Sequence, residues 1–327
     1  MEYRELGRTH RTVSSIGLGT WQLGSDWGNV DEKDAVAVLD ASVESGVTFF
    51  DTADVYGDGR SEEVIGRYLA ANPGHSITVA TKMGRRVDQV ASNYTLDNFR
   101  AWADRSRRNL GVETLDLVQL HCPPSSVYDS DAVYDALDTL VSEEVIATYG
   151  FSVEETSQAL AAIARPGTAT IQIILNAFRL KPLDEVLPAA REAGVGIIAR
   201  VPLASGLLSA KYSKQTAFAA DDHRNYNRDG SAFDVGETFS GVNYDDGLAA
   251  AQEFAALAPD GVSSAAAALA WVLQQAGVST VIPGARNPEQ ARSNAAAGSL
   301  APLGEQFEAS VQGIYDRYFR ASIHSRW

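Results

Sequence analysis

Residues 47–51 read VTFFD, a short run of strand-forming apolar residues that ends on an aspartate. Two further apolar runs end on an ionisable side chain, SITVATK on Lys82 and LDLVQLH on His121. In a parallel barrel of strands and helices, the carboxyl ends of the strands meet on one face, and that face carries the active site. The sequence therefore predicts that Asp51, Lys82 and His121 lie together in one pocket.

Outward from this stretch, short β-rich runs alternate with longer segments of helical periodicity along nearly the whole chain. The pattern indicates parallel strands joined by crossover helices, and eight such units favour a closed (β/α)8 TIM barrel over an open sheet. The predicted strands are Ser15–Leu18, Val47–Asp51, Ile77–Lys82, Leu115–His121, Val145–Phe151, Ile171–Asn176, Gly196–Val201 and Ser279–Pro283. The predicted helices are Glu32–Ser45, Ser61–Ala70, Leu96–Leu110, Asp131–Val141, Glu154–Arg165, Leu183–Ala193, Ser263–Gln275 and Pro288–Ala297, with a last one over Glu305–Tyr318 that completes the outer ring.

One connection is much longer than the others. From Ser213 to Gly247 the chain is polar and rich in Asp, Asn and Gly, beyond the usual length of a strand-to-helix loop. Because this long loop follows the seventh strand, we expect it on the active-site face, as a lid or cofactor clamp; an ordinary surface excursion is the alternative. No repeat or linker divides the chain, so residues 1–327 are interpreted as a single domain.

The composition restricts the class of protein. The chain has 327 residues, 45% of them hydrophobic, and a formal net charge of −15. That charge disfavours binding to nucleic acid or to an anionic membrane surface, so a small-molecule substrate is expected. No apolar stretch is long enough for a membrane span, the first residues lack a signal-peptide core, and a cytoplasmic protein is predicted. Cys122 is the only cysteine, which excludes an internal disulfide and a cysteine-rich zinc site; no metal is expected.

Tyr56 follows Asp51 in the loop DTADVYG, from which it can turn back over the barrel mouth toward Lys82 and His121. A neighbouring ammonium stabilises a phenolate, so Lys82 is expected to lower the pKa of Tyr56, while Asp51 keeps the lysine charged. Tyr56 is then a usable proton donor. His121 and Tyr56 can together hold a carbonyl oxygen as negative charge develops on it, which is chemistry suited to carbonyl reduction.

Each of these residues also has an ordinary structural interpretation. A lone aspartate at a strand end is usually a turn former or a helix cap, a lone histidine in a strand is usually a core residue, and Lys82 could be a surface charge. The catalytic interpretation rests on the set of four rather than on any single member.

With these motifs, the chain resembles the aldo-keto reductases, of the bacterial NADPH-dependent type. The stretches that carry the resemblance are FFDTADVYGDGRSEEVIG, VATKMG, DLVQLHCPP, GFS, IQIILNAF, VPLASGLLSAKY and VIPGARNPEQARSNAAA, which together span nearly the whole chain. The resemblance implies an NADPH-dependent oxidoreductase on a (β/α)8 barrel. It assigns Tyr56 as the acid, Lys82 and Asp51 as its tuning partners, and His121 as the group that orients the carbonyl.

The resemblance also implies a cofactor site in the second half of the chain. Residues 202–208 form a small-residue turn whose backbone N–H groups can approach a pyrophosphate, with a lysine nearby. Arg286, Gln290 and Asn294 share one helix face and resemble the family's adenosine clamp, in which an arginine grips the 2′-phosphate; an exposed polar helix face is the alternative. The expected cofactor residues are Thr20, Trp21, Asp51, Ser152, Gln172, Arg200, Val201, Pro202, Leu203, Ser205, Gly206, Leu208, Lys211, Gly284, Arg286, Gln290 and Asn294.

Two positions depart from the family pattern. Arg200 stands where many members place an aromatic ring that stacks on the nicotinamide, and Val153 stands where an asparagine is frequent. A guanidinium can lie flat on a ring, so Arg200 could replace the aromatic residue. Its positive charge would then disfavour the oxidised cofactor, which is itself cationic.

Tryptophans are expected to form the substrate wall beside Tyr56 and His121. Trp21, in the segment GLGTWQ, and Trp27 are the candidates, with core packing as the alternative for each. The same segment begins like a dinucleotide fingerprint, but it lacks the third glycine and no helix starts within it, so a Rossmann site is rejected.

The function predicted from the sequence is NADPH-dependent reduction of aldehydes or ketones by hydride transfer, with Tyr56 as proton donor. Two alternatives stay open. One is an NAD-dependent dehydrogenase of a sugar or polyol, and the other is a regulatory NADPH-binding subunit with little turnover. The substrate and the oligomeric state do not follow from the sequence.

Overall fold

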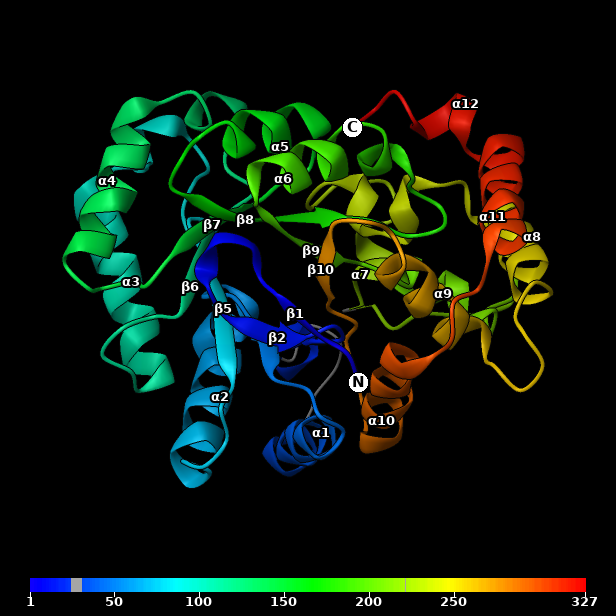
Figure 1. Ribbon diagram of the computed structural model, residues 1–327, viewed down its shortest axis with the longest axis horizontal. Coiled ribbons are helices and arrows are strands. Elements are labelled where there is room, and N and C mark those ends of the chain that lie inside the picture. The colour runs from blue at the N-terminus through cyan, green and yellow to red at the C-terminus, as the bar shows by residue number, and fades with distance from the viewer. Residues whose placement is uncertain (25–30, 221) are drawn as a thin grey trace.

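The computed structural model describes residues 1–24, 31–220 and 222–327 (Figure 1). Eight parallel strands lie side by side in the order β3 to β10. Parallel bridges from Ile16 to Val281 and from Gly19 to Gly284 join the two edges, so the sheet closes on itself and the predicted (β/α)8 barrel is confirmed. The strands are β3 (Leu18–Gly19), β4 (Phe49–Asp51), β5 (Thr78–Met83), β6 (Leu117–His121), β7 (Tyr149–Ser152), β8 (Thr168–Ile174), β9 (Gly196–Arg200) and β10 (Val278–Val281).

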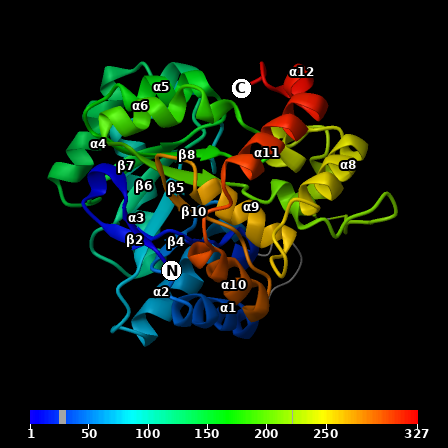
Figure 2. The ribbon, with the colours of Figure 1, turned by 45° about the vertical axis from the view of Figure 1, so that its right-hand side comes forward.

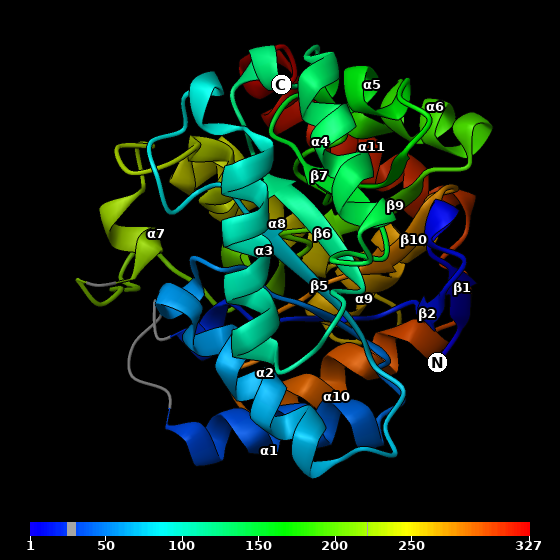
Figure 3. The ribbon, with the colours of Figure 1, turned by 90° about the vertical axis from the view of Figure 1, so that its left-hand side faces the viewer.

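Helices form an outer ring around these strands (Figures 1 and 2). Helices α1 and α10 come from opposite ends of the chain but pack side by side, because β3 and β10 are the strands at which the barrel closes (Figure 3). None of the described helices is long and apolar enough to cross a membrane. The ring contains α1 (Glu32–Glu44), α2 (Arg60–Ala71), α3 (Leu96–Leu110), α4 (Asp131–Ser142), α5 (Thr156–Ile163), α6 (Val186–Ala193), α8 (Tyr244–Ala255), α9 (Ser264–Leu273), α10 (Pro288–Ala296) and α11 (Glu305–Tyr318), followed by the short α12 (Arg320–Ile323).

An N-terminal hairpin, which the sequence pattern did not predict, covers the end of the barrel away from the site. Its strands are β1 (Tyr3–Glu5) and β2 (Thr12–Ser14). Leu6 and Val13 from this hairpin are fully buried against a cluster of barrel-interior residues. Gly7 has φ +50°, and a Cβ there would lie 2.0 Å from the backbone N of Gly196, so the hairpin can dock only through a glycine.

The long loop after β9 is partly ordered into short helices. These are α7 (His223–Tyr226), η8 (Val235–Glu237) and η9 (Phe239–Gly241), and a further short helix, η7 (Ala204–Ser209), precedes the loop. The loop ends earlier than predicted, because α8 begins at Tyr244. The Asn243 side chain caps this helix by accepting hydrogen bonds from the N–H groups of Asp245 and Asp246, and the two acidic residues suit the first turn.

Candidate active site

The structure brings the four predicted catalytic residues together. Asp51 and His121 are the last residues of β4 and β6, Lys82 is the last but one of the intervening β5, and each is 5% exposed or less. Lys82 Nζ lies 2.5 Å from Asp51 Oδ1 and 3.4 Å from the hydroxyl oxygen of Tyr56. The rings of Tyr56 and His121 meet edge to face with centroids 6.1 Å apart.

A close contact between two glycines fixes the loop that carries Tyr56. Gly57 has φ +58°, and a Cβ at this position would lie 2.1 Å from the carbonyl oxygen of Gly24. A Cβ on Gly24 would in turn lie 2.6 Å from the backbone N of Gly57. The backbone therefore turns directly after Tyr56, in a conformation that favours glycine, and this turn directs the tyrosine toward Lys82.

Asp51 is held by two amides as well as by the lysine. Gln172 Nε2 donates to Asp51 Oδ2 over 2.7 Å, and Gln119 Nε2 donates to the same oxygen over 3.3 Å. Gln172 was expected only to contact the cofactor, and in the structure it also holds the Asp51 carboxylate. The sequence interpretation missed Gln119, although it lies two residues before His121 and so on the same face of the strand.

The charges of this group follow from burial and from the ion pair. Burial lowers the pKa of Lys82, but Asp51 and Tyr56 raise it by more, so the ammonium stays charged. Burial raises the pKa of Tyr56, and the Lys82 charge offsets this only in part. The expectation of a net lowered pKa for Tyr56 is therefore wrong, because the sequence showed the cation but not the burial. The phenol keeps its proton at neutral pH.

His121 is neutral in this setting. Burial, followed by the charges of Arg85 and Lys82, holds its pKa well below the usual value. Its Nδ1 is buried with no hydrogen-bond partner among the described residues. Its Nε2 lies 3.5 Å from a guanidinium nitrogen of Arg85, a neighbour that the sequence interpretation did not identify.

Glu237, from the long loop, pairs with two arginines of the barrel. Its Oε1 lies 3.2 Å from Arg85 and 3.6 Å from Arg200. Burial raises the pKa of Glu237, but the two arginines lower it by more, and the carboxylate is ionised. The Arg200 guanidinium also donates to the carbonyl oxygen of Val153 over 3.1 Å. It is therefore engaged by protein groups, and Glu237 offsets part of the charge that was expected to act on an oxidised cofactor.

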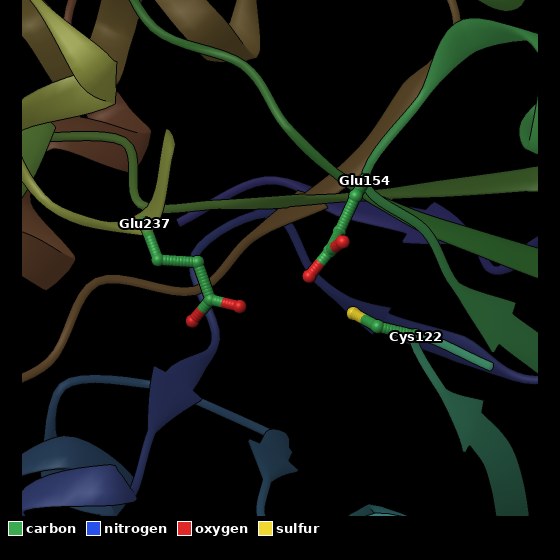
Figure 4. A group of neighbouring side chains, drawn as sticks. All are labelled: Cys122, Glu154 and Glu237. Atoms are coloured by element: carbon green, nitrogen blue, oxygen red, sulfur yellow. The ribbon is translucent and has the colours of Figure 1, made fainter. Parts of the chain in front are cut away.

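Cys122, Glu154 and Glu237 form a cluster beside this ion pair (Figure 4). One potential ligand atom from each lies within 4.8 Å of the others. Arg200 contacts both Cys122 Sγ and Glu237, so the positive charge beside this cluster comes from a protein side chain. Burial raises the pKa of Cys122 to about 11, which leaves a neutral thiol rather than a metal-binding thiolate. We assign no metal to this group.

A cavity of about 500 Å³ runs from Tyr56 and Asp51 toward α10. Ser152 and Leu208 were also expected at the cofactor, but they are buried outside its lining. The lining also includes Gln22, Tyr212, His223, Arg224, Glu237, Ser263 and Ser293, which the sequence interpretation missed because most come from the long loop or from distant segments. The expected cofactor residues that line the cavity are Thr20, Trp21, Asp51, Gln172, Arg200, Val201, Pro202, Leu203, Ser205, Gly206, Lys211, Gly284, Arg286, Gln290 and Asn294.

The turn after β9 has an unusual backbone. Val201, Ser205 and Gly206 all have positive φ angles, of 52°, 55° and 96°. A β-branched residue in this region is strained, so tertiary contacts must hold the turn. Ser205 Oγ supplies two of them, by donating to the carbonyl oxygen of Glu237 and by accepting from the N–H of Phe239. The long loop is thus fastened directly to the turn expected to hold a pyrophosphate.

The predicted adenosine clamp lies at the far end of the cavity. Gln290 Oε1 accepts from the backbone N–H of Arg286 over 2.9 Å, and Asn294 Nδ2 donates to the carbonyl oxygen of Gly284 over 3.0 Å. The Arg286 guanidinium is 43% exposed and lies 3.6 Å from Asp222 Oδ2 of the long loop. All three residues line the cavity, but only Gln290 and Asn294 lie on α10; Arg286 precedes the N-cap Asn287, so the expectation that it shares their helix face is wrong.

Trp21 lines the other end of the cavity, beside Tyr56, where an aromatic wall for the substrate is expected. Its ring stacks beside Tyr56 with centroids 6.0 Å apart and lies 4.9 Å from the ring of His223. Phe233 adds an edge contact at 6.0 Å. Trp27, the second tryptophan expected there, lies outside the described residues. The long loop thus contributes two rings to a wall that the sequence assigned to tryptophans.

Asp54, in the same DTADVYG loop, should make stability depend on pH. Burial and the charge of Glu62 raise its pKa to about 7, and its Oδ1 is buried with no hydrogen-bond partner in the described part of the chain. At pH values between the pKa of Asp54 in the unfolded chain and about 7, the folded state binds a proton that the unfolded state does not. The free energy of unfolding therefore falls as the pH rises through this range. Asparagine does not titrate, so the free energy of unfolding of Asp54→Asn should not show this fall. Measured against wild type, the variant should be about 2 kcal/mol more stable at about pH 8 than it is at about pH 5.5.

Urea unfolding of both proteins at the two pH values measures this gain. Asp58→Asn is the matched control, because Asp58 is exposed, pairs with Arg86, and has a lowered pKa. It should show no gain at the higher pH. Equal pH dependence in wild type and Asp54→Asn would contradict the assignment.

The chain matches the model of the aldo/keto reductase family over residues 15–316. It is 30% identical over 298 residues to the aldo-keto reductase YhdN of Bacillus subtilis, covering 89% of this chain and 86% of that one. Its fold is similar to the glycerol dehydrogenase AKR11B4 from Gluconobacter oxydans, with a TM-score of 0.79, 30% identity, and coverage of 97% and 96%. An aldo-keto reductase from Klebsiella pneumoniae in complex with NADPH has the same fold, with a TM-score of 0.70, 24% identity, and coverage of 96% and 95%. The chain belongs to the aldo/keto reductase family.

Proposed function

We propose that this protein reduces aldehydes or ketones to alcohols with NADPH. The observation that carries the proposal is the buried contact of Lys82 with both Asp51 and Tyr56 at the end of a long cavity. A cavity end that holds a protonated phenol against a fixed ammonium is suited to delivering a proton to an oxygen atom that gains charge.

The cavity fits a phosphorylated dinucleotide. Arg286 and Lys211 supply cations along its lining, and the strained turn at residues 201–206 lies between them and the Tyr56 end. Asn294 and Gln290 would hold the adenosine end, and Gln172 and Arg200 would lie at the nicotinamide end. When bound, NADPH supplies the hydride that the carbonyl carbon receives. The Klebsiella relative was crystallised with NADPH, which supports the same cofactor here.

Two side chains, Tyr56 and His121, bind the carbonyl oxygen in this proposal, and Lys82 and Asp51 support Tyr56. Tyr56 donates its proton to the oxygen as negative charge develops. The charged Lys82 stabilises the phenolate that remains, and Asp51 keeps the ammonium in place over 2.5 Å. Neutral His121 adds a second hydrogen bond to the same oxygen from Nε2.

The test is NADPH oxidation by the intact protein with a panel of small aldehydes. The loss of nicotinamide absorbance monitors the reaction. Turnover supports the proposal. Tight binding of NADPH without turnover of any aldehyde would instead favour a regulatory NADPH-binding subunit.

A polyol dehydrogenase is the second candidate, because a structural relative is a glycerol dehydrogenase. In the reverse reaction, alcohol oxidation, the Tyr56 phenolate would accept the proton of the alcohol hydroxyl. Comparing NADP+ with NAD+ in alcohol oxidation separates the two: a preference for NAD+ and for the oxidative direction would favour the dehydrogenase.

Arg286 should set the preference between the two cofactors. Its guanidinium lines the cavity and is suited to binding a 2′-phosphate in a bidentate manner. Arg286→Ala should weaken NADPH binding by about tenfold or more and leave NADH binding little changed. Fluorescence titration with each cofactor measures both constants.

The matched control is Arg292→Ala. Arg292 lies on α10, six residues after Arg286, but it is exposed and pairs with Glu44 on the surface. It should change neither constant. An equal loss of NADPH and NADH affinity in Arg286→Ala would contradict the assignment.

A further inference from the structure

The tail that follows α12 packs against the part of the long loop that carries Glu237. Figure 1 shows this tail returning toward α5, where Thr156 Oγ1 donates to the carbonyl oxygen of Trp327 over 3.3 Å. The Trp327 residue is 8% exposed, and its Nε1 donates to Asp234 Oδ2, at the start of η8, over 3.3 Å. Trp327 is therefore fixed through both its backbone and its ring.

The indole packs against two glycines of this loop segment, one on each side of Glu237. A Cβ on Gly241, which has φ +68°, would lie 2.6 Å from Trp327 Cη2. A Cβ on Gly236 would lie 3.0 Å from Trp327 Cζ2. Both positions thus favour a residue without a side chain, and the turn at residues 236–241 fits directly onto the ring.

A buried arginine covers a face of the same ring. Arg179 is 2% exposed, and its guanidinium carbon lies 3.9 Å from the centroid of the Trp327 ring. Its Nε and Nη1 have no hydrogen-bond partner among the described residues, while Nη2 donates to the carbonyl oxygen of Glu154. A cation is attracted to an indole face most strongly where both are withdrawn from water, so this contact holds the ring in one position.

The turn at residues 236–241 is joined to the wall of the cavity. Ser205 Oγ donates to the carbonyl oxygen of Glu237 and accepts from the N–H of Phe239, both over 3.0 Å. Ser205 belongs to the strained turn at residues 201–206 and lines the cavity, whereas Trp327 lies outside the lining. Phe239 has φ +53°, a conformation that persists only when surrounding contacts hold it. A short series of contacts therefore leads from the indole to the wall expected to bind the pyrophosphate.

We propose that Trp327 is a positioning residue for the cofactor site: it holds the turn at residues 236–241, which through Ser205 fixes the strained turn at residues 201–206. Loss of the indole should loosen both turns and weaken the binding of NADPH. This inference rests on the proposed binding of NADPH but not on the proposed carbonyl reduction.

Proteolysis without cofactor tests whether Trp327 holds the turn. Phe239 is 2% exposed, so chymotrypsin can cleave after it only when the turn opens. Trp327→Leu, which keeps an apolar side chain but loses the ring, should raise this cleavage rate by about tenfold or more. Cleavage after Phe254, which is buried in α8, reports unfolding of the barrel and should keep its rate. An equal increase at both sites would overturn the proposal, because it would mean a general loss of stability.

Cofactor titration tests whether the effect reaches the cavity wall. In Trp327→Leu the Kd for NADPH, followed by NADPH fluorescence, should rise by about tenfold, and Trp327→Phe, which restores a ring, should recover most of the affinity. In a Ser205→Ala background the same Trp327→Leu change should alter Kd by less than about twofold, because the connecting hydroxyl is gone. An unchanged Kd in Trp327→Leu, or effects that multiply in the double variant, would overturn the proposal.

Phe319→Leu is the matched control for the loss of a buried aromatic ring near the same tail. Phe319 is 1% exposed, and its ring contacts those of Phe178, Tyr315 and Tyr318. This variant should change neither the cleavage after Phe239 nor the Kd for NADPH.

The proposed function and the role of Trp327 can fail separately. Wild-type protein that binds NADPH but reduces no aldehyde would overturn the carbonyl reduction alone, and the titrations would still decide the role of Trp327. Wild-type protein that binds no NADPH would overturn both.

Discussion

Replacing Tyr56 with phenylalanine is expected to lower kcat for aldehyde reduction by about a hundredfold to ten-thousandfold. The variant loses only the hydroxyl that lies 3.4 Å from Lys82 and that is the proposed proton donor. The aromatic ring and its contact with Trp21 remain, so NADPH binding should be retained. Steady-state NADPH oxidation and a fluorescence titration with NADPH measure the two effects separately.

Tyr94→Phe is the control for the loss of a buried tyrosine hydroxyl. Tyr94 is buried, and its hydroxyl contacts the carbonyl oxygen of Gly84 over 3.5 Å and the side chain of Gln89. This variant should turn over aldehydes at close to the wild-type rate. Undiminished turnover in Tyr56→Phe would mean that another group donates the proton.

Lys82→Met should lower both the turnover of aldehydes and the free energy of unfolding. The variant leaves Asp51 buried, 2% exposed, without its ion-pair partner. Breaking a buried pair in this way costs about 3 to 5 kcal/mol in the free energy of unfolding. Turnover should also fall by about a hundredfold or more, because no cation remains to stabilise the Tyr56 phenolate.

A double variant separates these two consequences. Asp51→Asn combined with Lys82→Met removes both buried charges, so it should recover much of the lost stability without recovering turnover. Lys214→Met is the stability control, because Lys214 pairs with Asp245 at the surface and should cost less than about 1 kcal/mol. A double variant as unstable as Lys82→Met would show that packing, rather than an unpaired charge, causes the loss.

Much of the barrel could be predicted from local patterns. The helix over Glu305–Tyr318 and the start of α4 at Asp131 agree with the structure, because helical periodicity and end signals are properties of neighbouring residues. The first barrel strand was placed three residues early, at Ser15, because residues before Leu18 bond to β10 rather than to β4. The N-terminal hairpin was missed, since its strands are only three residues long.

The candidate site divides in the same way. Asp51, Lys82 and His121 could be found in the sequence because each lies at or next to the end of an apolar strand, and the ends of parallel strands converge in a barrel. Ser152 also ends a strand and, like Lys82 and His121, is buried outside the cavity lining. Lys82 and His121 differ from it in contacting Tyr56, which depends on packing in the folded barrel. The lowered pKa expected for Tyr56 failed for a related reason, because burial is a property of the assembled pocket.

The sequence by itself determined the alternation of the eight barrel strands with helices, the family, and the charged ends of three neighbouring strands, since these follow from the periodicity and chemistry of adjacent residues. It did not predict the N-terminal hairpin or α8. Only the tertiary structure decided that Glu237 reaches Arg85 and Arg200, that Gln172 holds Asp51, and that the long loop closes over the Tyr56 end of the cavity. These contacts join residues far apart in the chain, and their partners are selected by distance and burial in the folded barrel, which no local pattern records.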